Sequence, residues 1–383
     1  MRKTVNHINL IILLAVLSAV APIAVDTYIP SIPTMAKEFN VGIDKIELTL
    51  SIFLIGFAIG QIFGGVLSDN IGRKKSSLIG LIGFAFFSFL IIFSSTAYEL
   101  WIYRFLEAFF GGFIVVNASA IVRDLFSGKE AAKIFALIGS VRSLAPLLAP
   151  AIGAFIIHFY SWKIVFVFLT VYALVVALWV YKDLKETYTY VKINPIKSYK
   201  MVLQNSQAMQ MMFVLALGFS GMFTLIAKSS FIYMEYFGIS SDLFPLYFGF
   251  SILVLMGLIS VNVILLKSYA PLFLIKMAIF IQVLVSIVFM LVSKDISLVL
   301  TILLIASYIG VNAFIYGNAT ALVLEKFPTN SGVASALSGV IQFGIGAVIS
   351  TIVVMFHTDS LLPIAVSLFL ISITSFIVIK SYK

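Results

Sequence analysis

GGVLSDNIGRKKSS, residues 64–77, joins two long apolar segments and is the stretch that decides the fold. Gly64 and Gly65 have no side chains and would let the end of the preceding helix pack closely on another helix. Gly72 permits a tight turn. Asp69 can accept hydrogen bonds from the free N–H groups at a neighbouring helix N-terminus. The stretch therefore predicts a short, sharply turning connection between two helices.

The composition shows whether these helices lie in water or in a membrane. Of the 383 residues, 62% are hydrophobic and 11% are charged, whereas a soluble domain is about 45–50% apolar and about 25% charged. So much apolar surface excludes a soluble fold and indicates a membrane protein with many spans. Segments of about ten residues with alternating hydrophobicity, typical of an outer-membrane barrel, are absent from the sequence.

The charge and the metal-binding residue types exclude other classes. The net charge is +9, which in a membrane protein follows from the Lys and Arg of cytoplasmic loops, so we expect no nucleic-acid partner. The sequence has no cysteine, which excludes disulfides and thiolate-bound metals, and its three histidines form no cluster. We therefore expect neither a metal nor another cofactor.

The apolar segments give the number of membrane helices. A span needs about 20 predominantly apolar residues, and this criterion predicts an all-α membrane protein with twelve transmembrane helices in two halves of six. The predicted spans are 8–30, 45–67, 76–94, 98–122, 131–157, 162–181, 208–235, 243–266, 271–292, 296–324, 332–355 and 360–380. The one long polar connection is 182–207. We therefore predict a first half at 1–181, a linker at 182–207 and a second half at 208–383, an arrangement that suggests duplication.

The distribution of cations sets the orientation. Eighteen of the 25 Lys and Arg residues, including Arg73–Lys75, fall on one side of the predicted membrane. The other side has only Lys37, Lys45, Lys163 and Lys294. Because cytoplasmic loops carry the excess of Lys and Arg, both termini and the 182–207 connection are predicted to be cytoplasmic.

Asp26, at the end of the first apolar run, is the leading candidate for function. A carboxylate inside a membrane helix is costly, so it usually faces a water-filled pathway or a partner. The alternative is that Asp26 lies just outside the bilayer, among the lipid headgroups. In the predicted spans, Asp26 lies roughly 6 Å below the outer end of the first helix and Arg104 roughly 9 Å below that of the fourth. The similar depth makes both residues candidates for proton coupling.

Glu107 is the competing candidate for the proton carrier. It lies one turn from Arg104 on the same face of the fourth helix, because residues three apart are neighbours on a helix surface. An internal ion pair between Arg104 and Glu107 is therefore an explanation of equal weight for both residues.

Two further cations lie inside predicted spans. Arg142, midway along the fifth helix, either hydrogen-bonds backbone carbonyls or has a role in a substrate cavity. Lys228, in the outer part of the seventh helix, is expected to snorkel to the membrane surface, with a place in the cavity as the alternative.

Other residues are candidates for bending helices or lining a cavity. Pro146, Pro150 and Gly153 would deform the fifth helix. Several aromatic and amide side chains could line the substrate cavity, although packing against lipid or neighbouring helices is the more ordinary role of such residues. These side chains are Tyr28, Asn117, Phe223, Tyr233, Asn318 and Gln342.

Within 64–77, the pattern G-x-L-x-D-x-x-G-R-K resembles the signature loop of the major facilitator superfamily. The resemblance implies that Gly65, Asp69, Gly72, Arg73 and Lys74 form a gating loop. Other stretches resemble helices of its drug–proton antiporter branch and of the Bcr/CflA subfamily. They are WIYRFLEAFFGG (101–112), AIVRDLF (120–126), SLAPLLAPAIGAF (143–155), SSFIYMEYFG (229–238) and YGNATALVLEKFPTNSGVASALSGVIQF (316–343).

The chain also departs from that family's pattern. Glu107 stands where the family usually has glutamine, and Lys228 stands where small or polar residues are usual. The second-half counterpart of the signature loop, LLKSYAPLFLIKM at 265–277, lacks the acid and the glycines.

The resemblance implies a proton-coupled exporter of bicyclomycin, chloramphenicol and related compounds in the cytoplasmic (inner) membrane of a bacterium. Asp26 would take up a proton from outside and release it inside in exchange for substrate, by alternating access. The alternative is an exporter of a sugar, an amino acid or another metabolite on the same fold. An enzyme would need a catalytic constellation, and none is found in the sequence. We expect a monomer whose partners are a small-molecule substrate, protons and the lipid bilayer.

Overall fold

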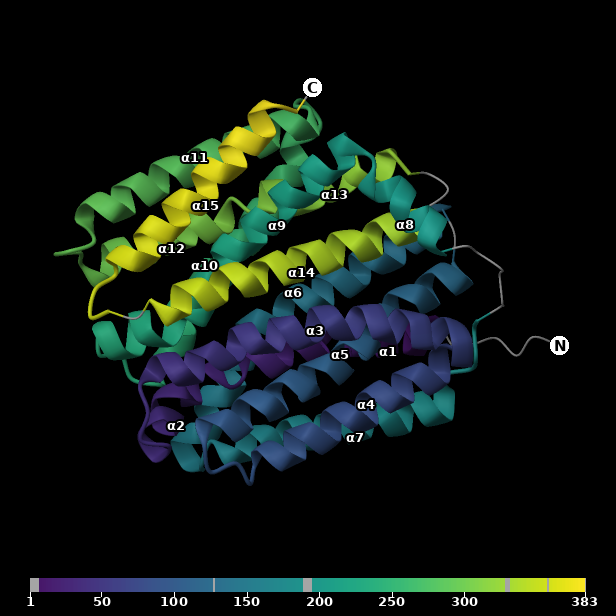
Figure 1. Ribbon diagram of the computed structural model, residues 1–383, viewed down its shortest axis with the longest axis horizontal. Coiled ribbons are helices and arrows are strands. Elements are labelled where there is room, and N and C mark those ends of the chain that lie inside the picture. Colours follow the sequence, from purple (N-terminus) through teal and green to yellow (C-terminus); the bar gives the residue numbers. More distant parts are fainter. Residues whose placement is uncertain (1–6, 127, 189–194, 328–330, 357, 383) are drawn as a thin grey trace. The chain divides into compact units, whose positions relative to one another are not determined.

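The chain is built from helices. Its computed structural model describes residues 7–126, 128–188, 195–327, 331–356 and 358–382. Throughout these ranges the regular elements are helical (Figure 1). Twelve of the helical stretches are long and apolar enough to cross a membrane. The predicted all-α fold with twelve transmembrane helices is confirmed.

The helices group into two compact units, Met1–Lys192 and Ile193–Lys383. The helices of the first unit are α1 (His7–Asp26), a short 3-10 helix (Ile29–Ser31), α2 (Ile32–Glu38), α3 (Ile43–Ile71), α4 (Arg73–Ile91), α5 (Ala97–Leu125), α6 (Gly128–Phe159) and α7 (Lys163–Asp183). Those of the second are α8 (Pro195–Leu203), α9 (Ser206–Ala227), a π-helix (Phe231–Tyr236), α10 (Phe244–Leu265), α11 (Pro271–Val292), α12 (Leu298–Gly310), α13 (Ala313–Glu325), α14 (Ser331–Met355) and α15 (Leu362–Lys380).

In the first unit, glycines bring α3 and α5 into close contact. Gly56, Gly60 and Gly64 recur every four residues along α3, so they lie on one face of the helix. A Cβ atom at Gly60 would lie 2.0 Å from the Phe109 carbonyl oxygen, and one at Gly64 would lie 2.6 Å from the Phe113 Cα. Small residues permit such close approach of membrane helices. Gly65 differs, because its nearest neighbour would be 3.9 Å away, so the close packing predicted for it is wrong.

The first span is longer and less regular than its hydropathy suggests. The α-helix ends at Asp26, and a 3-10 helix and α2 continue the apolar stretch to Glu38. Pro30 and Pro33 lie in the first positions of these two short helices, where a missing backbone N–H costs no hydrogen bond. The prolines thus explain why the helix restarts just after Asp26.

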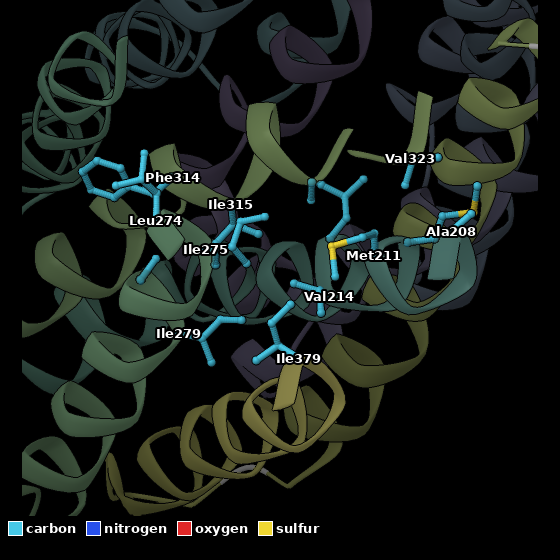
Figure 2. Packing of buried hydrophobic residues seen from close by; sticks show 14 of the residues in the cluster. Ala208, Met211, Val214, Leu274, Ile275, Ile279, Phe314, Ile315, Val323 and Ile379 are labelled. Carbon is cyan, nitrogen blue, oxygen red and sulfur yellow. The ribbon is translucent and has the colours of Figure 1, made fainter. Parts of the chain in front are cut away.

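In the second unit, a cluster of buried hydrophobic side chains joins α8, α9, α11, α13, α14 and α15 (Figure 2). Met211 and Val214 of α9 pack with Ile279 of α11, Ile315 of α13 and Ile379 of α15. Because lipid is as apolar as these side chains, van der Waals packing rather than the hydrophobic effect holds such helices together.

Two spans of the second unit are interrupted. The predicted span at 208–235 divides into α9 and the π-helix, and the span at 296–324 divides between Gly310 and Ala313. At the second break, Gln282 Nε2 donates to the Tyr308 carbonyl oxygen and to Asn312 Oδ1, each at 3.3 Å. Side-chain amides can satisfy backbone groups that a helix break frees inside a membrane.

Candidate functional site

Asp26 is the last residue of α1, and its side chain is enclosed by protein. Only 3% of the residue is exposed. Among the described residues, its carboxylate makes no hydrogen bond and no ion pair. Buried charges are normally paired because an unpaired one is costly. This acid therefore stands out within the first unit.

Arg104 and Glu107 of α5 pair with each other. Arg104 Nη1 donates to Glu107 Oε2 at 2.7 Å, and both side chains are fully buried. Ser88 of α4 donates to the other carboxylate oxygen at 2.6 Å. Arg104 Nη2 reaches α1 at the Ala24 carbonyl oxygen, 3.3 Å away. Of the two sequence-based alternatives for these residues, the structure contains the internal ion pair.

Aromatic rings enclose the same guanidinium. Its Cζ lies 4.5 Å from the ring centre of Phe53, 4.8 Å from that of Tyr28 and 5.9 Å from that of Phe166. Such cation–π contacts contribute about 2 kcal/mol where they are desolvated. The Tyr28 hydroxyl donates to the Ile46 carbonyl oxygen at 3.0 Å, which fixes its ring. Arg104 is therefore held by several helices of the first unit.

Gly153 of α6 lies against the backbone that follows Asp26. A Cβ atom at Gly153 would lie 1.8 Å from the Thr27 carbonyl oxygen, so only glycine permits this approach. The helix-bending role predicted for Gly153, Pro146 and Pro150 stays a prediction, although both prolines do lie inside α6. Arg142 also falls within α6, but its side chain lies outside the described residues.

The two asparagines predicted to line a cavity hydrogen-bond to neighbouring helices, and their role in the cavity stays a prediction. Asn117 of α5 donates to Ser76 Oγ of α4 at 2.9 Å, and Ser68 of α3 donates to the Asn117 side-chain oxygen. In the second unit, Asn318 of α13 donates to Asn262 Oδ1 of α10 at 2.9 Å. The two asparagines make corresponding links on the fourth and tenth spans.

Lys228 does not snorkel to the surface, and that prediction is wrong. The residue is 2% exposed, and its Nζ lies 4.7 Å from the Phe231 ring centre. It comes directly after α9, and the backbone N–H of Ile232 donates to its carbonyl oxygen at 2.8 Å, so the side chain stays enclosed beside the π-helix.

The other second-half cavity candidates are also partly or fully enclosed. Phe223 stacks on Phe219 with ring centres 5.7 Å apart. Tyr233 is 1% exposed in the π-helix, and Gln342 is half-buried on α14. Their role in binding substrate stays a prediction.

The 64–77 loop is organised by Arg73. Its guanidinium pairs with Asp69 at 2.6 Å and with Asp124 of α5 at 2.8 Å, and it also donates to Ser68 Oγ at 2.8 Å. Gly72 has φ 96°, a backbone conformation that favours glycine. The loop thus turns where predicted, and its cation binds two acids.

The acid that caps α4 is not the one predicted. Asp69 accepts from the Arg73 side chain, whereas Glu186, just after α7, accepts from the backbone N–H groups of Arg73 and Lys74. Partial burial on its own raises the pKa of Glu186, but backbone N–H donors, including that of Tyr188, outweigh it and hold the pKa below its ordinary value. The predicted capping role of Asp69 is therefore wrong. Lys74 adds a hydrogen bond to the Tyr181 carbonyl oxygen at 2.7 Å.

Sequence reasoning missed Ser88 and Glu186. Ser88 lies in an apolar helix and Glu186 in a polar linker, so neither stands out by composition. Asp124, in contrast, lies inside the quoted stretch AIVRDLF, so the sequence did contain a signal for it. Within the described ranges, no group of three or more His, Cys, Asp or Glu is placed to hold a metal ion.

Comparison with known proteins fits this architecture. A family model described as Major Facilitator Superfamily matches residues 14–351. The chain belongs to the Major Facilitator Superfamily. One superfamily relative, a bicyclomycin resistance protein homolog of Haemophilus influenzae, is 29% identical over 92% of this chain and 90% of that protein. A chloramphenicol resistance protein of Pseudomonas aeruginosa is 29% identical over 42% of this chain and 38% of that protein.

A solved structure has the same superfamily fold. The D-xylose–proton symporter aligns with a TM-score of 0.77 and 14% identity, covering 97% of each chain. At that identity the likeness concerns the fold alone. Membership of the Major Facilitator Superfamily, together with the twelve apolar helices, makes the chain a multi-pass membrane transporter whose substrate is a small molecule.

Proposed function

We propose that this chain exports small, drug-like molecules across the cytoplasmic membrane of a bacterium by alternating access, and that protons drive the export. The observation that carries the proposal is the match, over nine-tenths of both chains, to a protein named for bicyclomycin resistance. The partial match to a chloramphenicol resistance protein supports the same substrate class.

Asp26 is proposed as the proton carrier. Its carboxylate is buried without a partner among the described residues, whereas Glu107 is engaged by Arg104 and Ser88. An acid with no fixed partner can gain and lose a proton without first breaking an ion pair. Uptake of a proton would remove an unpaired buried charge, which gives its protonation a direct effect on the surrounding helices.

The 64–77 loop is proposed to stabilise one conformation of a cytoplasmic gate. The proposal places both termini and the loop in the cytoplasm, because the excess of Lys and Arg lies on that side. It treats 1–181 and 208–383 as halves that move about a substrate site, with 182–207 as the cytoplasmic linker between them, in a monomer.

The deciding experiment compares bacteria that lack drug exporters and carry the wild-type gene, an Asp26→Asn variant or an empty vector. We expect the wild type to raise the inhibitory concentration of at least one compound in a panel that includes bicyclomycin and chloramphenicol. Asp26→Asn should behave like the empty vector while retaining substrate binding in the purified protein, because it removes the proton site alone. Collapse of the proton gradient should stop wild-type export.

Two results would refute the proposal. Export that continues after the gradient collapses would exclude proton coupling, and uphill export by Asp26→Asn would remove Asp26 from that role. A wild-type protein that protects against no compound but releases a sugar or amino acid from the cells would favour a metabolite exporter.

A further inference from the structure

The beginning of the linker is fastened to the 64–77 loop. Glu186 Oε1 accepts from the Arg73 backbone N–H at 2.8 Å, and Glu186 Oε2 accepts from that of Lys74 at 3.3 Å. The backbone N–H groups of Thr187 and Tyr188 donate to the same carboxylate, each at 3.1 Å. We call residues 186–188 the linker clasp.

Gly72 provides the space for this carboxylate. A Cβ atom at Gly72 would lie 2.3 Å from Glu186 Oε2, so any other residue would force the carboxylate to shift from its place at the start of α4. The glycine therefore has two functions: its positive φ makes the turn, and its missing side chain admits the capping acid. The space left at Gly72 of the loop is thus filled by the Glu186 carboxylate of the clasp.

The other two clasp residues make their own contacts with the first unit. Thr187 Oγ1 donates to Asp124 Oδ2 at 3.2 Å, and the Tyr188 ring centre lies 4.7 Å from Arg73 Cζ. All three clasp residues thus bind the loop or the acid that pairs with it. The contact to the Arg73 backbone N–H is partly buried, whereas the hydrogen bonds to Lys74, Thr187, Tyr188 and Asp124 are exposed to water, and exposed contacts are individually weak. The clasp can therefore open as well as close.

The clasp fixes where the linker leaves the first unit. From Tyr188 to Pro195, where α8 begins, there are seven Cα–Cα steps, which span at most about 25 Å in any conformation. If the clasp opens, the last anchored residue is Leu184, which is buried after α7. Eleven steps then separate it from Pro195 and span at most about 40 Å. Opening adds about 15 Å to the maximum reach.

We propose that the linker clasp sets how far the two halves can separate at this end of the molecule. Closed, it limits the linker to its shorter reach and holds the 64–77 loop in its observed shape. Open, it permits the longer reach and leaves the first turn of α4 uncapped. The role in transport rests on the proposed function, but the reach itself follows from the contacts and the length of the chain.

The first test measures whether Glu186 holds the clasp closed. Hydrogen exchange is followed in the first turn of α4 in purified wild-type protein, in Glu186→Ala and in Asp183→Ala. Asp183 is an exposed acid of the same region, so its variant has the same change in charge. Glu186→Ala should speed exchange roughly 2- to 30-fold, the effect of losing a helix N-cap, and Asp183→Ala should not. Equal exchange in all three proteins would overturn the clasp.

The second test measures reach. The natural chain has no cysteine, so spin labels can be placed only at introduced Lys75→Cys and Lys326→Cys, both exposed positions, one in each half. In Glu186→Ala, the longest label–label distances should increase by up to about 15 Å. A four-residue Gly/Ser insertion after Val191 should produce the same increase with Glu186 intact, and Asp183→Ala should match wild type.

Unchanged distances in either the Glu186→Ala chain or the insertion chain would overturn the proposal, because the linker would not be what limits separation. Neither measurement needs a substrate, a proton gradient or transport. A failure of the proposed export function would therefore leave both tests interpretable.

Discussion

Gly153→Ala tests most directly whether the packing of α6 holds the backbone next to Asp26 in place. The added Cβ atom would lie 1.8 Å from the Thr27 carbonyl oxygen, and real Cβ contacts are essentially never below 3.0 Å. The obstacle is backbone, so no side-chain rotation relieves the overlap. Either α6 or the end of α1 must move by at least 1.2 Å, the difference between these two distances. Because Thr27 follows Asp26, the displacement occurs next to the proposed proton carrier.

Gly139→Ala is the matched control. Gly139 lies on the same helix, and a Cβ atom there would meet nothing within 4 Å. Both variants gain the better helix propensity of alanine, about 1 kcal/mol, so this term cancels in the comparison. What remains is the cost of overpacking, about 1–3 kcal/mol.

The assay compares thermal unfolding of the two purified variants in the same detergent, together with export at equal expression. Gly153→Ala should melt at a lower temperature than Gly139→Ala and should export more slowly, whereas Gly139→Ala should match or exceed wild-type stability. Identical melting temperatures and export rates for the two variants would refute the close approach of α6 to α1.

Three further outcomes are expected. Glu107→Ala leaves the buried Arg104 charge without its partner and should cost about 3–5 kcal/mol, whereas Glu107→Gln keeps an oxygen acceptor and should cost less by the same unfolding assay. Arg73→Ala breaks two ion pairs and Asp69→Ala only one, so the first should slow transport more, with substrate affinity changed less than about threefold in both. The pKa of Glu186 is lowered from 4.5, so its contribution to the stability of the first turn of α4 is present above that pH and is lost as the pH falls through the lowered value. Protection of this turn from hydrogen exchange should therefore fall in that pH range in wild type but not in Glu186→Gln.

Hydropathy was enough to predict the membrane helices, because the bilayer imposes one requirement on every span. The spacing of Arg104 and Glu107 was enough to predict their pair as one alternative, because i,i+3 contacts are local. The break between Gly310 and Ala313 was not predicted, and Gln282 of another helix donates hydrogen bonds to Tyr308 and Asn312 there. Hydropathy does not report such contacts.

The capping of α4 shows a second limit of sequence reasoning. The turn at 64–77 indicates that an acid should cap the next helix, and Asp69 is the acid nearest in sequence. The structure assigns that position to Glu186, 113 residues beyond Arg73, and Asp69 binds the Arg73 side chain instead. Local sequence determined that a cap was needed, and only the tertiary fold determined which acid provides it. The same holds for Gly153, whose requirement for glycine comes from the backbone of Thr27, just after α1.

Glu107 balances the buried charge of Arg104, which contacts α1 two residues before Asp26. Arg104 reaches α1 only at the Ala24 carbonyl oxygen, and its charge is balanced by Glu107 on its own helix. With glutamine at position 107, the usual residue of the family that the sequence resembles, Arg104 would keep an unbalanced charge near the end of α1. We expect Glu107→Gln to retain proton-driven export, because Asp26 is still present, but to change the pH at which export is half-maximal. Loss of coupling in Glu107→Gln, with coupling retained in Asp26→Asn, would make Glu107 the proton carrier.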